Sequence, residues 1–316
     1  MRVAILDDYQ NAALGSADWG PVTAKAEITV FTDHLEETGP LIERLAPFDV
    51  VCVMRERTPL SREVLQRLPR LKLIASTGPV NASIDLQAVR ERGIAVTNTG
   101  YGSTPAIELT WALILAATRH LVQESNSMRG GGWQTALGRE LRGRTLGIVG
   151  LGNIGSEVAR IGLAFGMTVV AWSQNLTAEK AAASGAKAVS REQLFGAADI
   201  VSIHLISSAR TRGLIGARDL ALMKATSILV NTSRGEIVDE VPLVSALEKK
   251  AIGGAALDVF QQEPLPANHP LRRLSNVLAT PHIGFVAEDL YRTFYGDAAA
   301  SIAAWLESAA GREGSP

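Results

Sequence analysis

The sequence predicts an α/β protein made of two Rossmann-like, doubly wound parallel-sheet domains. Short runs of β-branched and aliphatic residues alternate with segments of helical spacing along the chain, which is the pattern of parallel sheets covered by helices. The length of 316 residues exceeds that of a usual single domain. Together these two observations favour two domains of the same class.

The first hundred residues contain five expected strands. They are Val3–Leu6, Ile28–Phe31, Val50–Met54, Leu73–Ser76 and Ile94–Thr97. Leu41–Leu45 and Arg62–Leu68 have helical spacing and lie in the connections between these strands. Thr104-Pro105 then has the form of an N-cap followed by proline at the first helical position. The helix expected from there to about Val122 is apolar on most sides, so it must pack against a sheet or a partner subunit.

A second set of strands follows the glycine-rich stretch 130–133. They are Thr145–Val149, Thr168–Trp172, Ile200–Ile203, Ser227–Asn231 and Val277–Ala279. Helical segments separate them, and a long helical pattern, Val286–Ser308, closes the chain. The break near residues 98–104 therefore separates a first domain of about 100 residues from a second.

Charge and cysteine content exclude several classes of protein. Lys plus Arg number 31 and Asp plus Glu number 32, so the chain lacks the basic surface of a nucleic-acid binder. Cys52 is the single cysteine, which favours a reducing, cytoplasmic location. The apolar N-terminus stops at Asp7-Asp8, and the longest apolar run, Leu109–Ala117, is about half a membrane span. We expect a cytoplasmic protein with no membrane contact and, because the histidines lack ligand spacing, no metal site.

A G-x-G-x-x-G motif occupies residues 150–155, between the expected strand Thr145–Val149 and the helical run Glu157–Phe165. Gly150 allows the tight turn, Gly152 lets the backbone approach a pyrophosphate, and Gly155 permits close packing of helix on strand. The motif as a whole predicts a dinucleotide site. Its residues with an expected cofactor contact are Gly150, Gly152, Asn153, Ile154 and Gly155.

The residues after the next strand should contact the adenosine ribose. An Asp or Glu about 20 residues after the first glycine would bind the ribose hydroxyls and repel a 2′-phosphate. Here Ser173, Gln174 and Asn175 supply neither an acid nor an arginine. Charge therefore leaves the choice between NAD and NADP open, with NADP expected to be tolerated.

Four motifs together resemble the D-isomer-specific 2-hydroxyacid dehydrogenase family. They are Leu146–Gly155 (LGIVGLGNIG), Asn231–Gly235 (NTSRG), Leu257–Pro264 (LDVFQQEP) and Thr280–Gly284 (TPHIG). The resemblance extends over essentially the whole chain. It implies a flavodoxin-like substrate domain of residues 1–98 plus 286–316, a dinucleotide-binding domain of residues 99–285, and an active site in the cleft between them.

The resemblance places the family's catalytic residues on Arg234, Glu263 and His282. The residue types suit the reduction of a 2-keto acid. A guanidinium can orient the carboxylate and polarise the carbonyl, and an imidazole can donate a proton near neutral pH. A carboxylate bonded to that imidazole would fix its tautomer and stabilise its charged form.

Further cofactor contacts follow from the same resemblance. Asp258 matches the position that binds the nicotinamide carboxamide, and Thr232-Ser233 match a backbone contact. His204 matches a residue near the cofactor but could equally be a core histidine. Thr104 is either a cofactor contact or an N-cap.

The substrate domain contributes a loop whose backbone N–H groups would bind the substrate carboxylate. The matching residues are Thr77, Gly78, Pro79 and Val80. The loop departs from the family pattern, because Pro79 has no N–H group and Val80 stands where glycine is more usual. Arg55, in the loop after an expected strand, could reach the substrate, whereas Arg57 is better explained as part of a solvated loop.

The resemblance implies reversible hydride transfer between NAD(P) and a small 2-keto acid, giving a D-2-hydroxy acid. Glyoxylate or hydroxypyruvate is the leading expectation, because the chain lacks the C-terminal regulatory extension common in phosphoglycerate dehydrogenases. Two alternatives stay open: a D-3-phosphoglycerate dehydrogenase without a regulatory domain, with Arg55 or Arg57 at the phosphate, and an NAD(H)-sensing, corepressor-like scaffold. The family and the apolar helix Ile107–Ala117 also imply a homodimer formed mainly through the cofactor domain.

Overall fold

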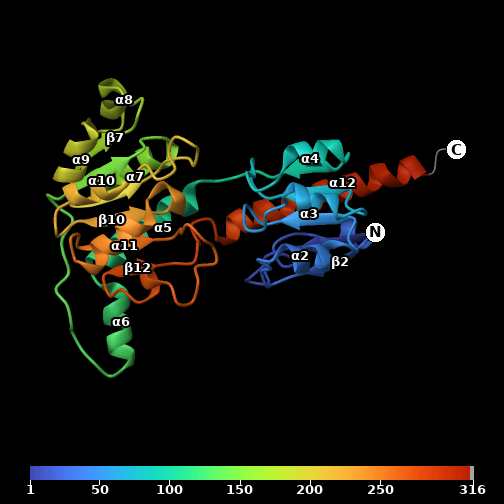
Figure 1. Cartoon of the computed structure of the whole chain (residues 1–316), viewed down its shortest axis with the longest axis horizontal. Coiled ribbons are helices and arrows are strands. Elements are labelled where there is room, and N and C mark those ends of the chain that lie inside the picture. Colours follow the sequence, from blue (N-terminus) through green and yellow to red (C-terminus); the bar gives the residue numbers. More distant parts are fainter. Residues whose placement is uncertain (314–316) are drawn as a thin grey trace. The chain divides into compact units, whose positions relative to one another are not determined.

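The computed structural model describes residues 1–313, with side chains to residue 309, and consists of two compact units (Figure 1). Unit 1 comprises residues 1–102 and the segment from Val286 onward, and unit 2 comprises residues 103–285. Each unit contains one sheet in which all neighbouring strands are parallel. The predicted fold class of two parallel-sheet α/β domains is confirmed.

Unit 1 is built on a five-stranded sheet in the order β2-β1-β3-β4-β5. Its strands are β1 (Arg2–Ile5), β2 (Glu27–Val30), β3 (Val50–Val53), β4 (Leu73–Ser76) and β5 (Ala95–Asn98). Its helices are α1 (Gly20–Thr23), α2 (Thr38–Leu45), α3 (Arg62–Gln66), α4 (Leu86–Glu91) and α12 (Glu288–Glu313). β3 and β4 are buried along their whole length, as expected for central strands covered on both faces.

The last helix packs on the first sheet. α12 contacts β4, β5 and α1 and buries Phe294, Tyr295 and Ile302. Figure 1 shows this helix, in red, beside the blue elements of the N-terminal sheet. A separate cluster of buried apolar side chains, which includes Leu45 and Leu65, packs α2, α3 and α4 against the strands of unit 1. Unit 1 is therefore completed by a segment that follows unit 2 in the sequence.

Unit 2 is built on a seven-stranded sheet in the order β12-β11-β10-β9-β6-β7-β8. Its strands are β6 (Thr145–Val149), β7 (Thr168–Trp172), β8 (Lys187–Ala188), β9 (Ile200–Ile203), β10 (Ile228–Asn231), β11 (Gly254–Leu257) and β12 (Val277–Ala279). Its α-helices are α5 (Thr104–Thr118), α6 (Leu121–Arg129), α7 (Asn153–Ala164), α8 (Ala178–Ala183), α9 (Arg191–Ala197), α10 (Ala217–Leu222) and α11 (Glu240–Glu248). Two 3-10 turns complete it, η1 (Gly235–Ile237) and η2 (Pro270–Arg272).

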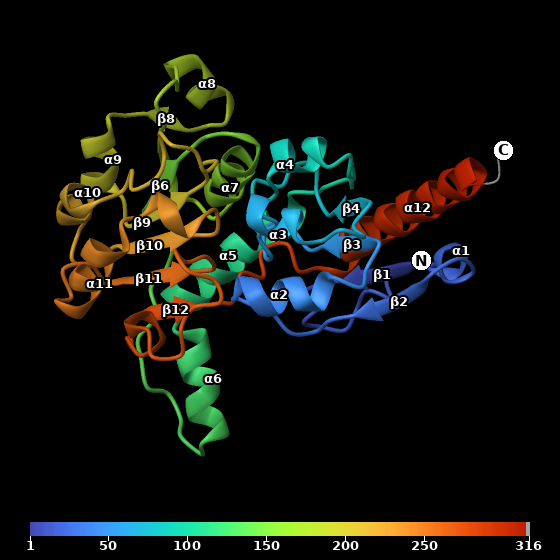
Figure 2. The same cartoon turned by 45° about the vertical axis from the view of Figure 1, so that its right-hand side comes forward.

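Apolar side chains cover both faces of the seven-stranded sheet. One face packs against α9, α10 and α11 through a core that includes Leu194, Leu220 and Leu243. The other packs against α5 and α7 through a core that includes Trp111 and Val158. Figure 2 shows these two groups of helices on opposite sides of the strands. This burial on both faces explains why the strands read as continuous apolar runs.

The helix expected from Thr104 to about Val122 is two helices. α5 ends at Thr118 and α6 begins at Leu121, because His120 between them has a left-handed backbone with φ of 53°. The prediction that Thr104 is an N-cap is also wrong. Ser103 occupies that position, and Thr104 and Pro105 are the first two helical residues. Proline fits there because N–H groups of the first turn have no partner within a helix.

The expected strands agree with the structure to within one residue at each end, except that β8 and β11 were not expected. The helices differ more: α2 begins at Thr38 instead of Leu41, α7 at Asn153 instead of Glu157, and α12 ends at Glu313 instead of Ser308. Among the residues described, no helix is both long and apolar enough to cross a lipid bilayer.

Candidate active site

The strands of unit 2 end at one level and so place separate loops along one edge of the sheet. The final residues in register are Trp172, Val149, Ile203, Asn231, Leu257 and Ala279. The next residues are Ser173, Gly150, His204, Thr232, Asp258 and Thr280. Ligands of open parallel sheets bind outside this carboxyl edge. Residues far apart in the sequence therefore line one candidate site.

The glycine turn between β6 and α7 has the shape of a phosphate-binding site. Gly150 has φ of 99°, and a Cβ there would lie 2.5 Å from the His204 carbonyl oxygen. A Cβ on Gly155 would lie 2.1 Å from the Gly150 carbonyl oxygen, so helix and turn can only meet at a glycine. At Gly152 a Cβ would meet nothing within 4 Å. The N-terminus of α7 is thus open at Gly152, where a pyrophosphate would bind.

Asn153 and Ile154 are the first two residues of α7, the former exposed and the latter half-buried. β7 lies next to β6 at the same carboxyl edge of the sheet. The carbonyl of its last residue, Trp172, accepts a hydrogen bond from Gly150 N (2.9 Å). Ser173, the next residue, is half-buried and Gln174 is exposed.

His204 is a neutral ring behind the glycine turn. Its backbone N donates to the Val149 carbonyl (2.8 Å), and its Nε2 lies 2.9 Å from Ser202 Oγ. Removal from water lowers the pKa of His204 to about 3. This histidine cannot serve as the proton donor of a reaction near neutral pH.

Asn231 organises the loop that carries Arg234. Its side-chain oxygen accepts from Ser233 N (3.0 Å) and its amide nitrogen donates to the Arg234 carbonyl (2.9 Å). Thr232 Oγ1 lies 2.8 Å from Thr110 Oγ1 of α5, which fixes the loop to the helix below. These hydrogen bonds therefore fix the backbone position from which the Arg234 side chain extends.

A close approach of two loops links Arg234 to the residues that follow β11. A Cβ on Gly235 would lie 2.0 Å from the carbonyl carbon of Phe260, so only glycine permits this contact. Phe260 N in turn donates to Glu263 Oε1 (2.8 Å). The loop of Arg234 thus packs against the loop of Glu263.

Glu263 and His282 form a short hydrogen bond. Glu263 Oε2 lies 2.5 Å from His282 Nδ1, with side chains 33% and 27% exposed. The ring of His282 meets that of Phe285 edge-on at 5.4 Å. Among the residues described, His282 Nε2 has no hydrogen-bond partner. This nitrogen is the one that can exchange a proton with a substrate.

Asp258 clamps the loop that carries His282. Its Oδ1 accepts from Thr280 Oγ1 (2.6 Å) and Ile283 N (2.9 Å), and its Oδ2 accepts from Gly284 N (2.8 Å). These partners flank His282, whose φ of 53° is uncommon for a residue with a side chain. Burial raises the pKa of Asp258, although the hydrogen bonds and the nearby His282 oppose that shift. The predicted contact of Asp258 with the nicotinamide carboxamide stays a prediction.

The candidate carboxylate loop lies in unit 1, directly after β4. Gly78 N donates to Thr99 Oγ1 (2.7 Å) and Thr77 N donates to the Val53 carbonyl (3.1 Å), so these two donors are used within the unit. Pro79 has no N–H group. Within residues 1–313, Val80 N makes no hydrogen bond, and the Val80 side chain is 69% exposed. The donor best placed for a ligand is thus the backbone N–H of Val80.

Arg55 belongs to the same loop cluster. Its backbone N donates to Thr77 Oγ1 (2.8 Å), and its carbonyl accepts from Asn81 Nδ2 (2.6 Å). The guanidinium lies against Gly78, where a Cβ would come within 1.7 Å of Nη1, and its Cζ is 5.3 Å from the centroid of the Tyr101 ring. Arg55 therefore presents a cation beside the loop in unit 1.

The structure groups the predicted residues in two sets. The loops of Arg234, Glu263, His282 and Asp258 adjoin the cofactor-binding edge of unit 2, and Thr104 is exposed at the start of α5. The carboxylate loop and Arg55 lie in unit 1. Sequence reasoning missed the organising roles of Asn231 and Thr99. An asparagine two residues before Ser233 is a recognisable turn signal, whereas nothing local marks Thr99. Within the described part of the chain, no group of acidic, histidine or cysteine side chains is arranged to bind a metal ion.

Comparison with known proteins shows which sequences and structures this chain resembles. Residues 111–284 match the family model described as D-isomer specific 2-hydroxyacid dehydrogenase, NAD binding domain. A glyoxylate reductase from Aeropyrum pernix is 46% identical over 230 residues, which cover 70% of this chain and 69% of that protein. A D-3-phosphoglycerate dehydrogenase from Methanocaldococcus jannaschii is 38% identical over 267 residues, 83% of this chain and 50% of that protein, so the match spans half the relative's length. The crystal structure of a phosphoglycerate oxidoreductase from Vibrio cholerae O395 has 39% identity and a TM-score of 0.93, covering 98% of this chain and 99% of that chain.

Proposed function

Since the chain belongs to the D-isomer-specific 2-hydroxyacid dehydrogenase family, and is thus an NAD-binding oxidoreductase of the CH–OH group, we propose that it reduces a small 2-keto acid such as glyoxylate or hydroxypyruvate. The observation that carries this proposal is the 2.5 Å hydrogen bond between His282 Nδ1 and Glu263 Oε2. It commits Nδ1 to the carboxylate and leaves Nε2 to act on the substrate carbonyl.

In the proposed reduction, each of three residues has its own role: Arg234, Glu263 and His282. The Arg234 guanidinium binds the substrate carboxylate and polarises the carbonyl. The nicotinamide, when bound, supplies the hydride. His282 Nε2 donates its proton to the carbonyl oxygen, so that no free alkoxide forms. Glu263 holds the ring through Nδ1, and in the oxidative direction the neutral ring accepts the proton instead.

We propose that the Val80 N–H in unit 1 binds the carboxylate of the same substrate. It is the loop donor that the fold leaves unused among residues 77–80. A charge-assisted bond from a backbone N–H to a carboxylate is stronger than one to a neutral acceptor. Val80→Pro removes this donor and should raise KM for 2-keto acids more than it changes kcat, whereas Val80→Ala, which keeps the N–H, should not.

Oxidation of 3-phosphoglycerate is the second candidate, favoured by the cation of Arg55 beside the loop and by the names of two relatives. A panel of 2-keto acids that includes 3-phosphohydroxypyruvate separates the two candidates. Glyoxylate or hydroxypyruvate should give the highest kcat/KM. A preference for the phosphorylated acid that is lost in Arg55→Gln would establish the second candidate. No turnover of any 2-keto acid with NADH or NADPH would contradict both.

For the cofactor, we propose that NADPH is accepted at least comparably with NADH. Ser173 and Gln174 offer a hydroxyl and an amide where an acid would repel a 2′-phosphate. Ser173→Asp should shift the preference toward NADH. A hundredfold preference of the wild type for NADH, about 2.7 kcal/mol, would contradict the proposal.

We also propose a homodimer formed through unit 2 and a cytoplasmic location. α6 extends away from the rest of unit 2 (Figures 1 and 2) and exposes Leu121, Val122 and Met128, at 60%, 48% and 63%. A second copy covering such residues by two-fold symmetry is the commonest arrangement. Light scattering should return twice 33.5 kDa at micromolar concentration. The single cysteine, Cys52, suits a reducing compartment.

A further inference from the structure

Arg191 stands over the aromatic ring at the end of β7. Its guanidinium carbon lies 5.4 Å from the centroid of the Trp172 ring, within the range of a cation–π interaction. Trp172 is the residue immediately before Ser173, and its carbonyl is bonded to the glycine turn at Gly150. Arg191 therefore places a cation on the ring of the residue that precedes Ser173, whereas the segment Ser173–Asn175 itself carries none.

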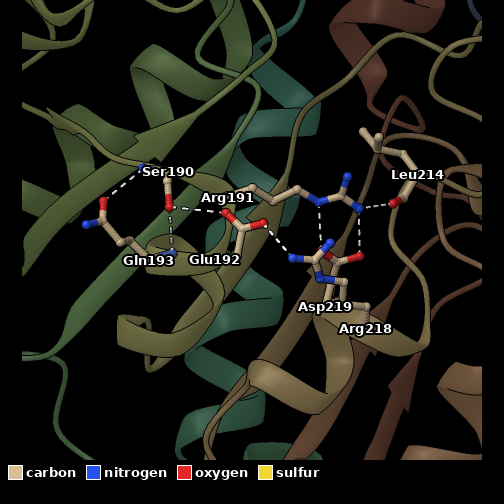
Figure 3. Close-up of polar contacts among 7 residues, drawn as sticks. All are labelled: Ser190, Arg191, Glu192, Gln193, Leu214, Arg218 and Asp219. Atoms are coloured by element: carbon tan, nitrogen blue, oxygen red, sulfur yellow. Dashed lines mark hydrogen bonds and ion pairs between the residues drawn. The ribbon is translucent and has the colours of Figure 1, made fainter.

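A buried carboxylate holds this guanidinium in place (Figure 3). Arg191 Nε donates to Asp219 Oδ1 (2.7 Å) and Nη2 donates to Oδ2 (2.6 Å), while Nη2 also donates to the Leu214 carbonyl. Asp219 is 4% exposed and also accepts from Gly216 N (3.0 Å). One edge of the guanidinium is thus fully used. Within the described part of the chain, the remaining nitrogen, Nη1, makes no hydrogen bond.

The position of Arg191 relates it to the dinucleotide. It begins α9 shortly after the end of β8, whose last residue, Ala188, pairs with Ala171 of β7, so it lies near the carboxyl edge of the sheet, as the glycine turn and Ser173 do. In folds of this kind the adenosine ribose binds next to the strand that follows the glycine motif, which is β7 here. The 2′-phosphate of NADP would project from that ribose.

We propose that Arg191, through Nη1 and together with the Ser173 hydroxyl, binds the 2′-phosphate of NADP(H). A guanidinium paired on one edge and stacked on a ring is pre-organised, so little rotamer entropy is lost on binding. Asp219 offsets the charge of Arg191, which limits the gain from a phosphate and leaves NAD(H) acceptable. The inference rests on the proposed tolerance of NADPH and identifies the residue responsible for it.

Arg218 provides a matched control. It is an arginine of the same cluster in Figure 3, bonded to Glu192 (3.2 Å), but its side chain is 81% exposed, and no contact between it and Trp172 is present in the described residues. Replacing either arginine by glutamine removes one positive charge from the same surface. A purely long-range charge effect would therefore appear in both variants.

The test is calorimetric titration of the protein with 2′,5′-ADP and with 5′-AMP, which needs no turnover. R191Q should lower the affinity for 2′,5′-ADP at least tenfold and change that for 5′-AMP less than twofold, and R218Q should change neither by more than twofold. R191K keeps the charge next to Asp219 but loses the planar fork, so it should fold normally and bind 2′,5′-ADP with intermediate affinity.

Two outcomes would overturn the role of Arg191. One is an unchanged affinity of R191Q and R191K for 2′,5′-ADP, and the other is an equal loss for both nucleotides, which would make the residue structural. A wild-type protein that binds 5′-AMP but not 2′,5′-ADP would instead overturn the proposed tolerance of NADPH, so the two failures are distinguishable.

Discussion

Of the histidine–carboxylate pairs in the described residues, two bond through Nδ1, one in each unit, and these two have different surroundings. In unit 1, His34 Nδ1 lies 2.8 Å from Asp7 Oδ1, with side chains 9% and 2% exposed. In unit 2, His282 Nδ1 lies 2.5 Å from Glu263 Oε2, with side chains 27% and 33% exposed. The bond is alike, but one pair is sealed and the other is open to solvent.

The partners of each carboxylate explain the difference. Asp7 also accepts from Thr58 Oγ1 (2.6 Å), and its carbonyl accepts from Arg57 Nη1 (2.6 Å), so the pair ties together the loops that follow three strands. Glu263 instead bonds its own loop at Phe260 N and leaves His282 accessible. In the proposed mechanism, the same chemical pair is therefore a structural tie when buried and a proton donor when one edge of the ring is open.

The largest expected effect is on His282. His282→Asn should slow single-turnover reduction about 10²–10⁴-fold, because the proton donor is lost, while nucleotide affinity stays within twofold. His34→Asn is the matched control and should change the hydride step less than twofold. Equal rate losses in the two variants would contradict the assignment of different roles.

The Asp7–His34 pair of unit 1 should affect the stability of the fold. Asp7→Asn leaves the largely covered His34 ring and the buried Thr58 with a poorer partner and should lower the free energy of unfolding by about 3 kcal/mol. The midpoint of urea unfolding measures this change. Glu263→Gln should shift that midpoint far less, and a larger shift there would mean that the exposed pair is also a structural tie.

Glu263→Gln should instead affect the chemistry. Loss of the charged partner should slow reduction by about thirtyfold, or ~2 kcal/mol, the contribution of a hydrogen bond to a charged group. An unchanged rate of single-turnover reduction would remove Glu263 from the mechanism.

The smallest effect concerns pH and His34. Its hydrogen bond to Asp7 raises the pKa of His34. A histidine raised above its unfolded value of about 6.5 stabilises the fold fully below that pH and loses this contribution as the pH rises through the folded-state pKa. The wild type should therefore be more stable than His34→Gln by up to ~2 kcal/mol near pH 6, and the difference should shrink by pH 9. A difference that grows with pH in urea unfolding would contradict the pairing.

Local patterns predicted the parts of the fold that depend on neighbours in the sequence. The expected strands Thr145–Val149 and Thr168–Trp172 agree with β6 and β7 in both bounds, and the glycine motif lies between a strand and a helix as expected. The catalytic roles of Arg234, Glu263 and His282 were predicted from the resemblance of four motifs to those of a known family. The structure adds the close approach at Gly235 and the bond that joins Glu263 to His282.

Contacts between distant residues could not be predicted in this way. The tie of His34 to Asp7 and the donation of Gly78 N to Thr99 each depend on tertiary placement, which no periodicity encodes. The break between α5 and α6 had only a weak signal, because histidine is enriched among left-handed residues but adopts that conformation only in a minority of cases. The approach of Arg191 to Trp172 is likewise a tertiary contact, made from the start of α9, and no local pattern marks it.

Unit 2 is a continuous stretch of chain, whereas unit 1 needs α12 to cover its sheet. On the ribosome, Phe285 emerges before any of α12, so unit 2 can acquire all its strands while unit 1 still exposes the surface that Phe294 and Ile302 will bury. Synthesis of residues 286–316 takes roughly 2–6 s at 5–20 residues per second. During that interval the nascent N-terminal sheet exposes apolar surface that the finished fold covers, which makes it prone to aggregation.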